Sequence, residues 1–256
     1  MIELDGILPS KVMLDNLAAE NKPVILNFSR GKDSIAVWIE LERRDMTVIP
    51  IHKSAVPGLK WIEDDLKRYE DYFGQHIIDL PSDGFYRRLN NFIFQPPERL
   101  AMITAANLPS PTREQWDQIM RASYAQDDTW ILDGVRATDS AQRRMAIMRH
   151  GAIKERTRRQ SPIWDFGIAD VRKSLKDRGI TLGLDYEWFG EYTGGVKNKK
   201  KGPGRTLDGI RYDYLKPISE YAPDDYQRIL HWFPLAEMEL LRIEGFPEPT
   251  PTKDPN

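Results

Sequence analysis

The chain has 256 residues, enough for one α/β domain with a sizeable core, and its net charge of −2 gives no general case for binding nucleic acid or a membrane surface. It contains no cysteine, which excludes disulfides, thiolate zinc sites and cysteine nucleophiles within it. No apolar run approaches the roughly 20 residues of a membrane span, and the first residues lack the basic and apolar regions of a signal peptide. We therefore expect a cytoplasmic protein without membrane contact.

Strand and helix patterns alternate along most of the chain. Apolar runs predict five strands, over 23–28, 47–52, 76–80, 129–133 and 212–218. Helical periodicity and capping signals predict helices over 10–19 with Ser10 as N-cap, 33–44, 58–74, 112–124, from Pro223 onward, and 234–244. This alternation favours a doubly wound, mostly parallel five-stranded sheet with helices on both faces and a helical C-terminal extension.

A short polar loop, Ser-Arg-Gly-Lys-Asp-Ser, occupies residues 29–34 between the first strand and the following helix. Backbone N–H groups and the positive end of a helix dipole meet at such a loop, which favours an anion. Lys32 adds a cation, the two serines add hydroxyls, and Asp33 offers a carboxylate to a divalent metal. The loop is not a Walker loop, because Gly31 directly precedes Lys32. It predicts a site for the phosphates of a nucleotide, and the alternative is an ordinary polar turn.

A second polar segment follows the predicted strand at 129–133 and contains Gly134, Arg136, Asp139, Ser140 and Arg143. Arginine donates paired hydrogen bonds to phosphate or sulfate oxygens, and a glycine at a strand end lets the backbone approach a ligand. The alternative is that the arginines lie on a solvated helix face. Ligands of doubly wound sheets bind beyond the carboxyl ends of the strands, so both segments are expected at one site.

The two segments together resemble a known family. The loop at 29–34 resembles the S-G-G-K-D-S pyrophosphate-binding loop of the adenine-nucleotide alpha-hydrolase (N-type ATP pyrophosphatase) superfamily, and the chain is most similar to its phosphoadenosine-phosphosulfate (PAPS) reductase family. The segment at 134–143 resembles the family's G-x-R-x-x-[DEQ]-S-x-x-R element. Either 160–171 or 214–230 resembles its R-x-x-P-[IL]-x-x-W-x-x-x-D-V stretch. The resemblance runs from about residue 20 to about residue 245 and implies a HUP-like fold.

The resemblance also implies a ligand and residue roles. ATP or a related adenosine nucleotide would bind with Mg²⁺, with Asp33 helping to hold the metal and Lys32 and Arg136 steadying the phosphates, so these three are the expected catalytic residues. The implied nucleotide contacts are Ser29, Arg30, Gly31, Lys32, Asp33, Ser34, His52, Gly134, Arg136, Ser140 and Arg143. Arg30 stands where many relatives have glycine, and its long side chain would shape access to the phosphates. For His52 the alternative is a strand-end histidine that meets solvent or a neighbour.

The absence of cysteine argues against the family's redox chemistry. A PAPS reductase needs a cysteine nucleophile, and related enzymes hold an iron–sulfur cluster on several cysteines. We therefore expect an enzyme that cleaves ATP between its alpha and beta phosphates, giving AMP and pyrophosphate, with water or another group as acceptor. The alternative is a catalytically weak nucleotide-binding accessory or assembly protein of a phage, plasmid or defence system.

We expect a nucleotide-binding core over 1–155 with a helical insertion at about 81–128, a part over 156–246 that completes the sheet and covers the site, and a disordered tail over 247–256. The basic loop at 197–205 either contacts nucleic acid or a protein complex or is a solvated surface loop. The last predicted helix, 234–244, either completes the core or forms a homodimer contact.

Overall fold

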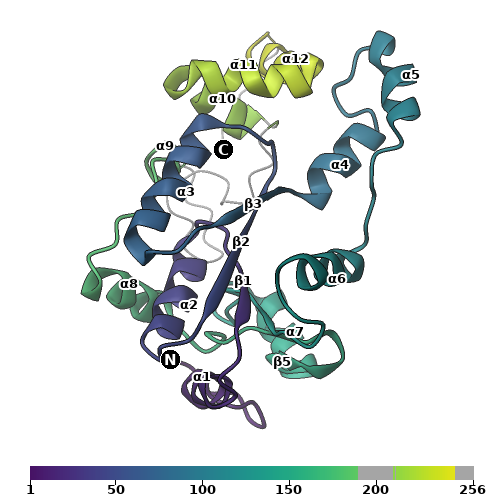
Figure 1. Cartoon of the computed structure of the whole chain (residues 1–256). Helices are drawn as coiled ribbons and strands as arrows, with labels where there is room; N and C mark the ends of the chain where they lie inside the picture. The colour runs from purple at the N-terminus through teal and green to yellow at the C-terminus, as the bar shows by residue number, and fades with distance from the viewer. Residues whose placement is uncertain (190–209, 211, 246–256) are drawn as a thin grey trace, which may run out of the picture.

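A six-stranded sheet forms the centre of the structure (Figure 1). The computed structural model describes residues 1–189, 210 and 212–245. The strands are β1 (Val24–Asn27), β2 (Val48–Ser54), β3 (Ile78–Pro81), β4 (Ile131–Leu132), β5 (Ile153–Lys154) and β6 (Arg159–Gln160). They lie in the order β3-β2-β1-β4-β6-β5, and the neighbouring pairs are parallel except β5 with β6. The fold is therefore α/β with a mostly parallel sheet, as the sequence predicts.

Helices precede, connect and follow the strands. They are α1 (Ser10–Ala19), α2 (Lys32–Glu42), α3 (Lys60–Phe73), α4 (Asp83–Asn90), α5 (Pro97–Ala106), α6 (Arg113–Tyr124), α7 (Ala141–His150), α8 (Ile168–Asp177), α9 (Asp185–Phe189), α10 (Tyr212–Tyr221), α11 (Pro223–Trp232) and α12 (Glu237–Gly245), with 3-10 turns η1 (Glu155–Thr157) and η2 (Pro234–Ala236). The predicted helices at 10–19, 33–44, 58–74 and 112–124 and the one beginning at Pro223 are confirmed, with ends shifted by up to two residues. No helix in the described part of the chain is long and apolar enough to cross a bilayer.

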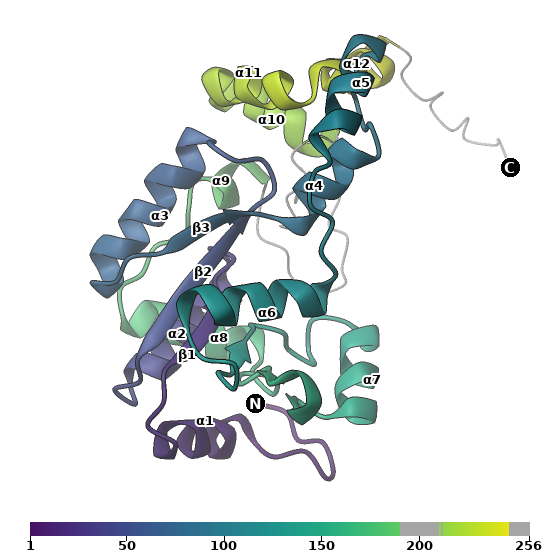
Figure 2. The ribbon, with the colours of Figure 1, turned by 45° about the vertical axis from the view of Figure 1, so that its right-hand side comes forward.

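Helices cover both faces of the sheet, because alternate strand residues are apolar on both sides. Ile25 and Ile131 pack with Met120 of α6 on one face. Leu26 and Leu132 belong to the larger core on the other face, which includes α2. Figure 2 shows α6 lying across the front of the strands, with α2 behind them. Strands buried on both faces explain the continuous apolar runs of the sequence.

Two sequence predictions about single elements are wrong. Residues 212–218, predicted as the fifth strand, lie in α10, where Tyr214, Leu215 and Ile218 are buried at the spacing of one helix face. The sheet is completed instead by β6 and β5, each of two residues, which are too short to show a strand periodicity. Ser10 is not the N-cap of α1, since Pro9 holds that position and the Ser10 N–H donates to Asp165 at 2.9 Å.

The C-terminal helices pack against the segment between β3 and β4. Figure 1 shows α10, α11 and α12 beyond the end of α3. Backbone and side-chain hydrogen bonds join them to the α4–α5 region: the Leu235 N–H donates to the Phe94 carbonyl at 3.0 Å, and Gln95 Nε2 donates to the Trp232 carbonyl at 2.7 Å. The basic loop at 197–205 and the tail at 247–256 lie outside the described residues.

Candidate functional site

A cavity of about 510 Å³ opens at the carboxyl ends of β1 and β4. The chain passes from β1 to β2 on one side of this point, whereas β4 lies on the other side of β1, so the strand order reverses here. Open α/β sheets bind their ligands at such a switch point. The lining residues are Asn27, Ser29, Asp33, Ser34, Lys53, Asp83, Arg113, Trp116, Asp133, Gly134, Val135, Arg143 and Arg159.

The loop at 29–34 forms the N-terminal end of α2, with Gly31 as N-cap. The Ser34 hydroxyl holds the loop in shape, since it accepts from the Ser29 N–H at 3.2 Å and donates to the Gly31 carbonyl at 2.9 Å. The Ser29 hydroxyl lies 3.1 Å from it. The first turn of α2 therefore presents its N–H groups and the positive end of its dipole beside the cavity.

A chain of alternating charges joins the two polar segments predicted from the sequence. Lys32 Nζ lies 2.9 Å from Asp33 Oδ2, and Arg136 Nε lies 3.0 Å from Asp33 Oδ1. Arg136 Nη2 also donates to Asp139 at 2.6 Å, and Asp139 pairs with Arg143. Lys32 and Arg136 are buried, and Arg143 is half exposed. The Asp33 and Asp139 carboxylates thus hold three cations in one row beside the cavity.

The residues present do not fit a resident metal at Asp33. Both carboxylate oxygens already face cations, so a metal there would have to displace Lys32 or Arg136. Across residues 1–189, 210 and 212–245, no group of three or more histidine or carboxylate side chains is placed to hold a metal ion. The geometry of Asp33 fits the positioning of the two cations instead.

Gly134 brings the two segments into contact. A Cβ atom at this position would lie 2.8 Å from the carbonyl carbon of Asp33 and 2.9 Å from the backbone nitrogen of Ser34. Real Cβ atoms do not approach backbone so closely. The role expected for a strand-end glycine, close approach of the backbone, therefore applies here to the loop itself.

Arg30 points away from the cavity, in contrast to the expectation that it shapes access to the phosphates. Its φ of 58° is in the left-handed region, and its side chain is buried. Arg30 Nη1 pairs with Asp65 at 2.8 Å, Nη2 lies 3.5 Å from Asp185, and the guanidinium stacks over Trp61 at 4.8 Å from the ring centre. The backbone of Arg30 remains in the loop, while its side chain joins the loop to α3 and α9.

Helix α9 contacts the loop at a second point. Tyr186 Oη accepts a hydrogen bond from the backbone N–H of Lys32 at 2.7 Å. This N–H belongs to the first turn of α2, whose donors have no partner within the helix. Docking of α9 thus satisfies one of the donors that an anion at the loop would use.

Besides Arg30, five residues from the predicted contact set do not line the cavity: Gly31, Lys32, Arg136, His52 and Ser140. Lys32 and Arg136 lie behind the lining, on either side of Asp33. His52 is buried, and its Nδ1 lies 2.8 Å from the Phe28 carbonyl, which ties β2 to the end of β1. Ser140 is the N-cap of α7, where its hydroxyl accepts from the Arg143 N–H at 3.2 Å. His52 and Ser140 support the segments that form the site.

The sequence reasoning missed a row of polar residues on the α6 face of the sheet. Asn27, Lys53 and Asp133 each stand two residues after an isoleucine, at 25, 51 and 131, that packs against α6. Because side chains alternate along a strand, all three continue on that face, and they line the cavity. Arg159 of β6 extends the row, and Arg113 and Trp116 of α6 face it.

The positive charge of Lys53 in this row destabilises the folded protein. Burial lowers the pKa of its ammonium group, and so do the neighbouring charges of Arg159 and Arg113, while Asp83 and Asp117 raise it. Replacing Lys53 by methionine, which keeps the length of the side chain, is expected to stabilise the fold at neutral pH. This gain should shrink as the pH rises through the folded-state pKa towards 10.5, because wild-type Lys53 then loses its charge and the cost with it. Urea unfolding of both proteins from pH 7 to pH 10.5 measures the difference, and a gain that grows with pH would contradict the prediction.

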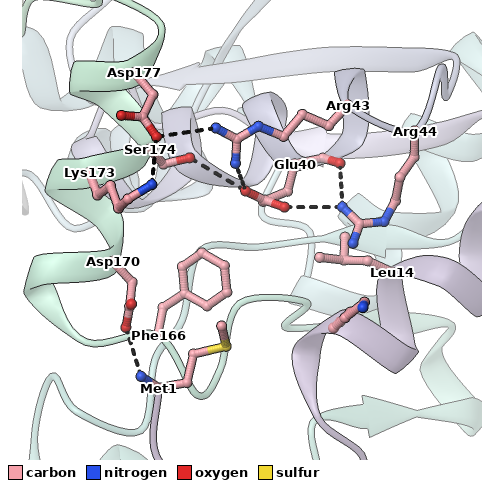
Figure 3. Close-up of a pocket in the computed structure, with 11 residues that line it drawn as sticks. Met1, Leu14, Glu40, Arg43, Arg44, Phe166, Asp170, Lys173, Ser174 and Asp177 are labelled. Carbon is pink, nitrogen blue, oxygen red and sulfur yellow. Dashed lines mark hydrogen bonds and ion pairs between the residues drawn. The ribbon is translucent and has the colours of Figure 1, made fainter.

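A second cavity, of about 260 Å³, lies between α1, α2 and α8 (Figure 3). Its charged side chains bind one another: Glu40 pairs with Arg43 and Arg44, and Lys173 pairs with Asp177 at 2.9 Å. Apart from Lys11, the charged groups around it are paired, Asp170 with the N-terminal ammonium group, and the cavity is not at the switch point of the sheet, so it is a weaker candidate for a charged ligand than the cavity at β1 and β4.

Comparison with known proteins adds no assignment: neither a protein-family model nor a curated protein matches this chain.

Proposed function

We propose that this protein binds Mg-ATP in the cavity at β1 and β4 and cleaves it between the alpha and beta phosphates, giving AMP and pyrophosphate. One observation carries the proposal: the loop at 29–34 and the segment at 134–143, which resemble two elements of one nucleotide-binding family, meet at the switch point of a mostly parallel sheet. On this proposal the fold is HUP-like, and the protein is a cysteine-free, non-reductase relative of the PAPS reductases.

The charges at the loop suit a polyphosphate. Lys32 and Arg136 supply two buried cations next to the cavity, and Arg143 supplies a third in its lining; Asp33 and Asp139 offset two of these charges and leave one net positive charge. The first turn of α2 adds backbone donors. Low-dielectric surroundings strengthen such interactions with phosphate oxygens. Mg²⁺ enters as part of the substrate, bound mainly by phosphate oxygens and water, as is usual for this ion.

Catalysis here consists of positioning and charge stabilisation. An acceptor oxygen forms a bond to the alpha phosphorus, the bond from that phosphorus to the bridging oxygen breaks, and pyrophosphate leaves with the electron pair. Lys32 and Arg136 neutralise the charge that develops on the leaving group, and Asp33 keeps both cations in place. The buried ring of His52 is bound to the Phe28 carbonyl through Nδ1, so it is given no part in this step.

Incubation with alpha-labelled ATP and Mg²⁺, followed by product separation, tests the proposal. The wild type is expected to form labelled AMP. Lys32→Met should lower the rate by about 100-fold, because one preorganised charge at the phosphates is lost. Lys67→Met, which removes an exposed lysine on α3, is the matched control and should leave the rate unchanged.

The other outcomes separate the alternatives. Labelled ADP would show cleavage between the beta and gamma phosphates, which contradicts this proposal. ATP binding without AMP formation would favour an accessory protein that binds nucleotide and catalyses little. Absence of both binding and turnover would reject both functions.

A further inference from the structure

We propose that the α6 side of the cavity binds a second anionic group, a carboxylate or phosphate of the acceptor substrate, through Lys53 and Arg113. This inference rests on the proposed function, since it names the class of acceptor that shares the cavity with the nucleotide. The nucleotide phosphates lie at the loop, on the side of α2, whereas Lys53 and Arg113 belong to the α6 side.

The uncompensated charges on the α6 side are positive. Arg159 is neutralised by Asp117 at 2.7 Å, and Asp83 lies 3.5 Å from Arg87, which leaves Lys53 and Arg113 against the single charge of Asp133, itself 3.6 Å from Arg159. The balance on this side is therefore one positive charge. In the described part of the chain, neither Lys53 nor Arg113 has a carboxylate within 4.0 Å. A lysine that burial deprives of water and that has no counter-ion is costly for the fold, and an anion in the cavity would offset that cost.

Residues on the α6 side of the cavity also carry buried polar atoms without a hydrogen-bond partner in the described part of the chain. Trp116 is 8% exposed and Arg159 is 7% exposed. Within residues 1–189, 210 and 212–245, Trp116 Nε1 and Arg159 Nε have no hydrogen-bond acceptor, and Asn27 Oδ1 has no donor. Buried donors and acceptors are nearly always satisfied in folded proteins, so a polar ligand on this side would gain hydrogen bonds from these atoms once their side chains turn toward the cavity. The flat indole of Trp116 gives this ligand an apolar wall.

In this proposal the anionic group only anchors the acceptor in the cavity, and no covalent bond to it forms or breaks. Lys53 on β2 and Arg113, the first residue of α6, bind the anionic group of the acceptor, while the loop at 29–34 binds the nucleotide. Such a division allows both substrates to be held together, which is how proximity lowers the barrier of a two-substrate reaction.

Calorimetric titration of inorganic phosphate into protein saturated with Mg²⁺ and α,β-methylene-ATP, which cannot be cleaved at the relevant bond, tests the proposal. One phosphate is expected to bind to the loaded wild type. Lys53→Met and Arg113→Gln should each weaken it by about tenfold, the usual effect of losing one charge-assisted hydrogen bond. Lys67→Met should leave it unchanged. Circular dichroism checks that each variant is folded. Because Arg113 is exposed, its replacement should disturb the fold less than replacement of Lys53.

Three results would overturn the inference: no phosphate binding to the loaded protein, binding that neither variant weakens, or displacement of the nucleotide analogue by phosphate. Failure of the proposed function gives a different pattern. If the analogue does not bind at all, phosphate is titrated into unloaded protein, and binding lost in Lys53→Met but retained in Lys32→Met still supports the second anion site. Binding lost in Lys32→Met and retained in Lys53→Met rejects it.

Discussion

Replacing Arg30 by alanine is expected to lower the free energy of unfolding by about 3–5 kcal/mol, the usual cost of removing one partner from a buried ion pair. The guanidinium is 1% exposed and faces Asp65 and Asp185, which are themselves buried. Without Arg30, the buried carboxylate of Asp65 would retain only the pair with the partly exposed Arg68, and Asp185 would lose the nearby guanidinium. Urea unfolding of both proteins measures the difference.

Arg30→Gly separates backbone strain from the ion pair. Arginine and alanine both adopt the φ of 58° at a cost of roughly 1–2 kcal/mol, whereas glycine adopts it freely. The glycine variant should therefore be more stable than the alanine variant by about that amount and still less stable than the wild type. Arg156→Ala, which breaks an exposed pair with Glu114, is the control and should change stability little. A glycine variant as stable as the wild type would show that the buried pair contributes nothing net.

Gly134→Ala is expected to lower AMP formation by about 100-fold, because an added methyl group must push the loop out of place and a misplacement of about 1 Å has an effect of that size. The methyl would lie 2.8 Å from the backbone of Asp33, and backbone cannot move aside as the end of a long side chain can. Overpacking of this kind should also lower stability by about 1–3 kcal/mol.

The control for this variant is Gly84→Ala in α4, where the nearest atom to the new methyl is the Ser82 hydroxyl at 3.5 Å. It should keep the wild-type rate. The decisive comparison is the rate of AMP formation per folded molecule, with folding measured by circular dichroism. Equal rates for Gly134→Ala and the wild type would mean that contact between the two segments does not matter for the reaction.

The sequence predicted the parts of the fold that depend on neighbours in the chain. The strand before the loop, the helix after it and the positions of the first four strands along the chain follow from local periodicity, and the structure confirms them. The loop and the segment at 134–143 were expected at one edge of the sheet, and Gly134 and Arg136 do contact Asp33.

What the sequence could not predict depends on long-range packing. The partners of Arg30 lie 35 and 155 residues further along the chain, so no local pattern distinguishes a phosphate contact from a buried ion pair. The polar row on the α6 face did leave a readable signal, since Asn27, Lys53 and Asp133 each follow a core isoleucine by two residues. Arg113 and Trp116 face this polar row only because of where α6 packs on the sheet. Local periodicity does not specify that position.

The hydrogen bond from the Lys32 N–H to Tyr186 has a thermodynamic consequence. A ligand oxygen that takes this N–H must break a contact with a residue 154 positions away in the sequence. Occupancy of the loop and docking of α9 are then coupled equilibria, and the coupling is reciprocal. If α9 docking lowers the affinity of the loop for a ligand by some factor, ligand binding lowers the equilibrium constant for α9 docking by the same factor. Any partner that draws α9 off the loop would raise the affinity of the loop for such a ligand by the same factor.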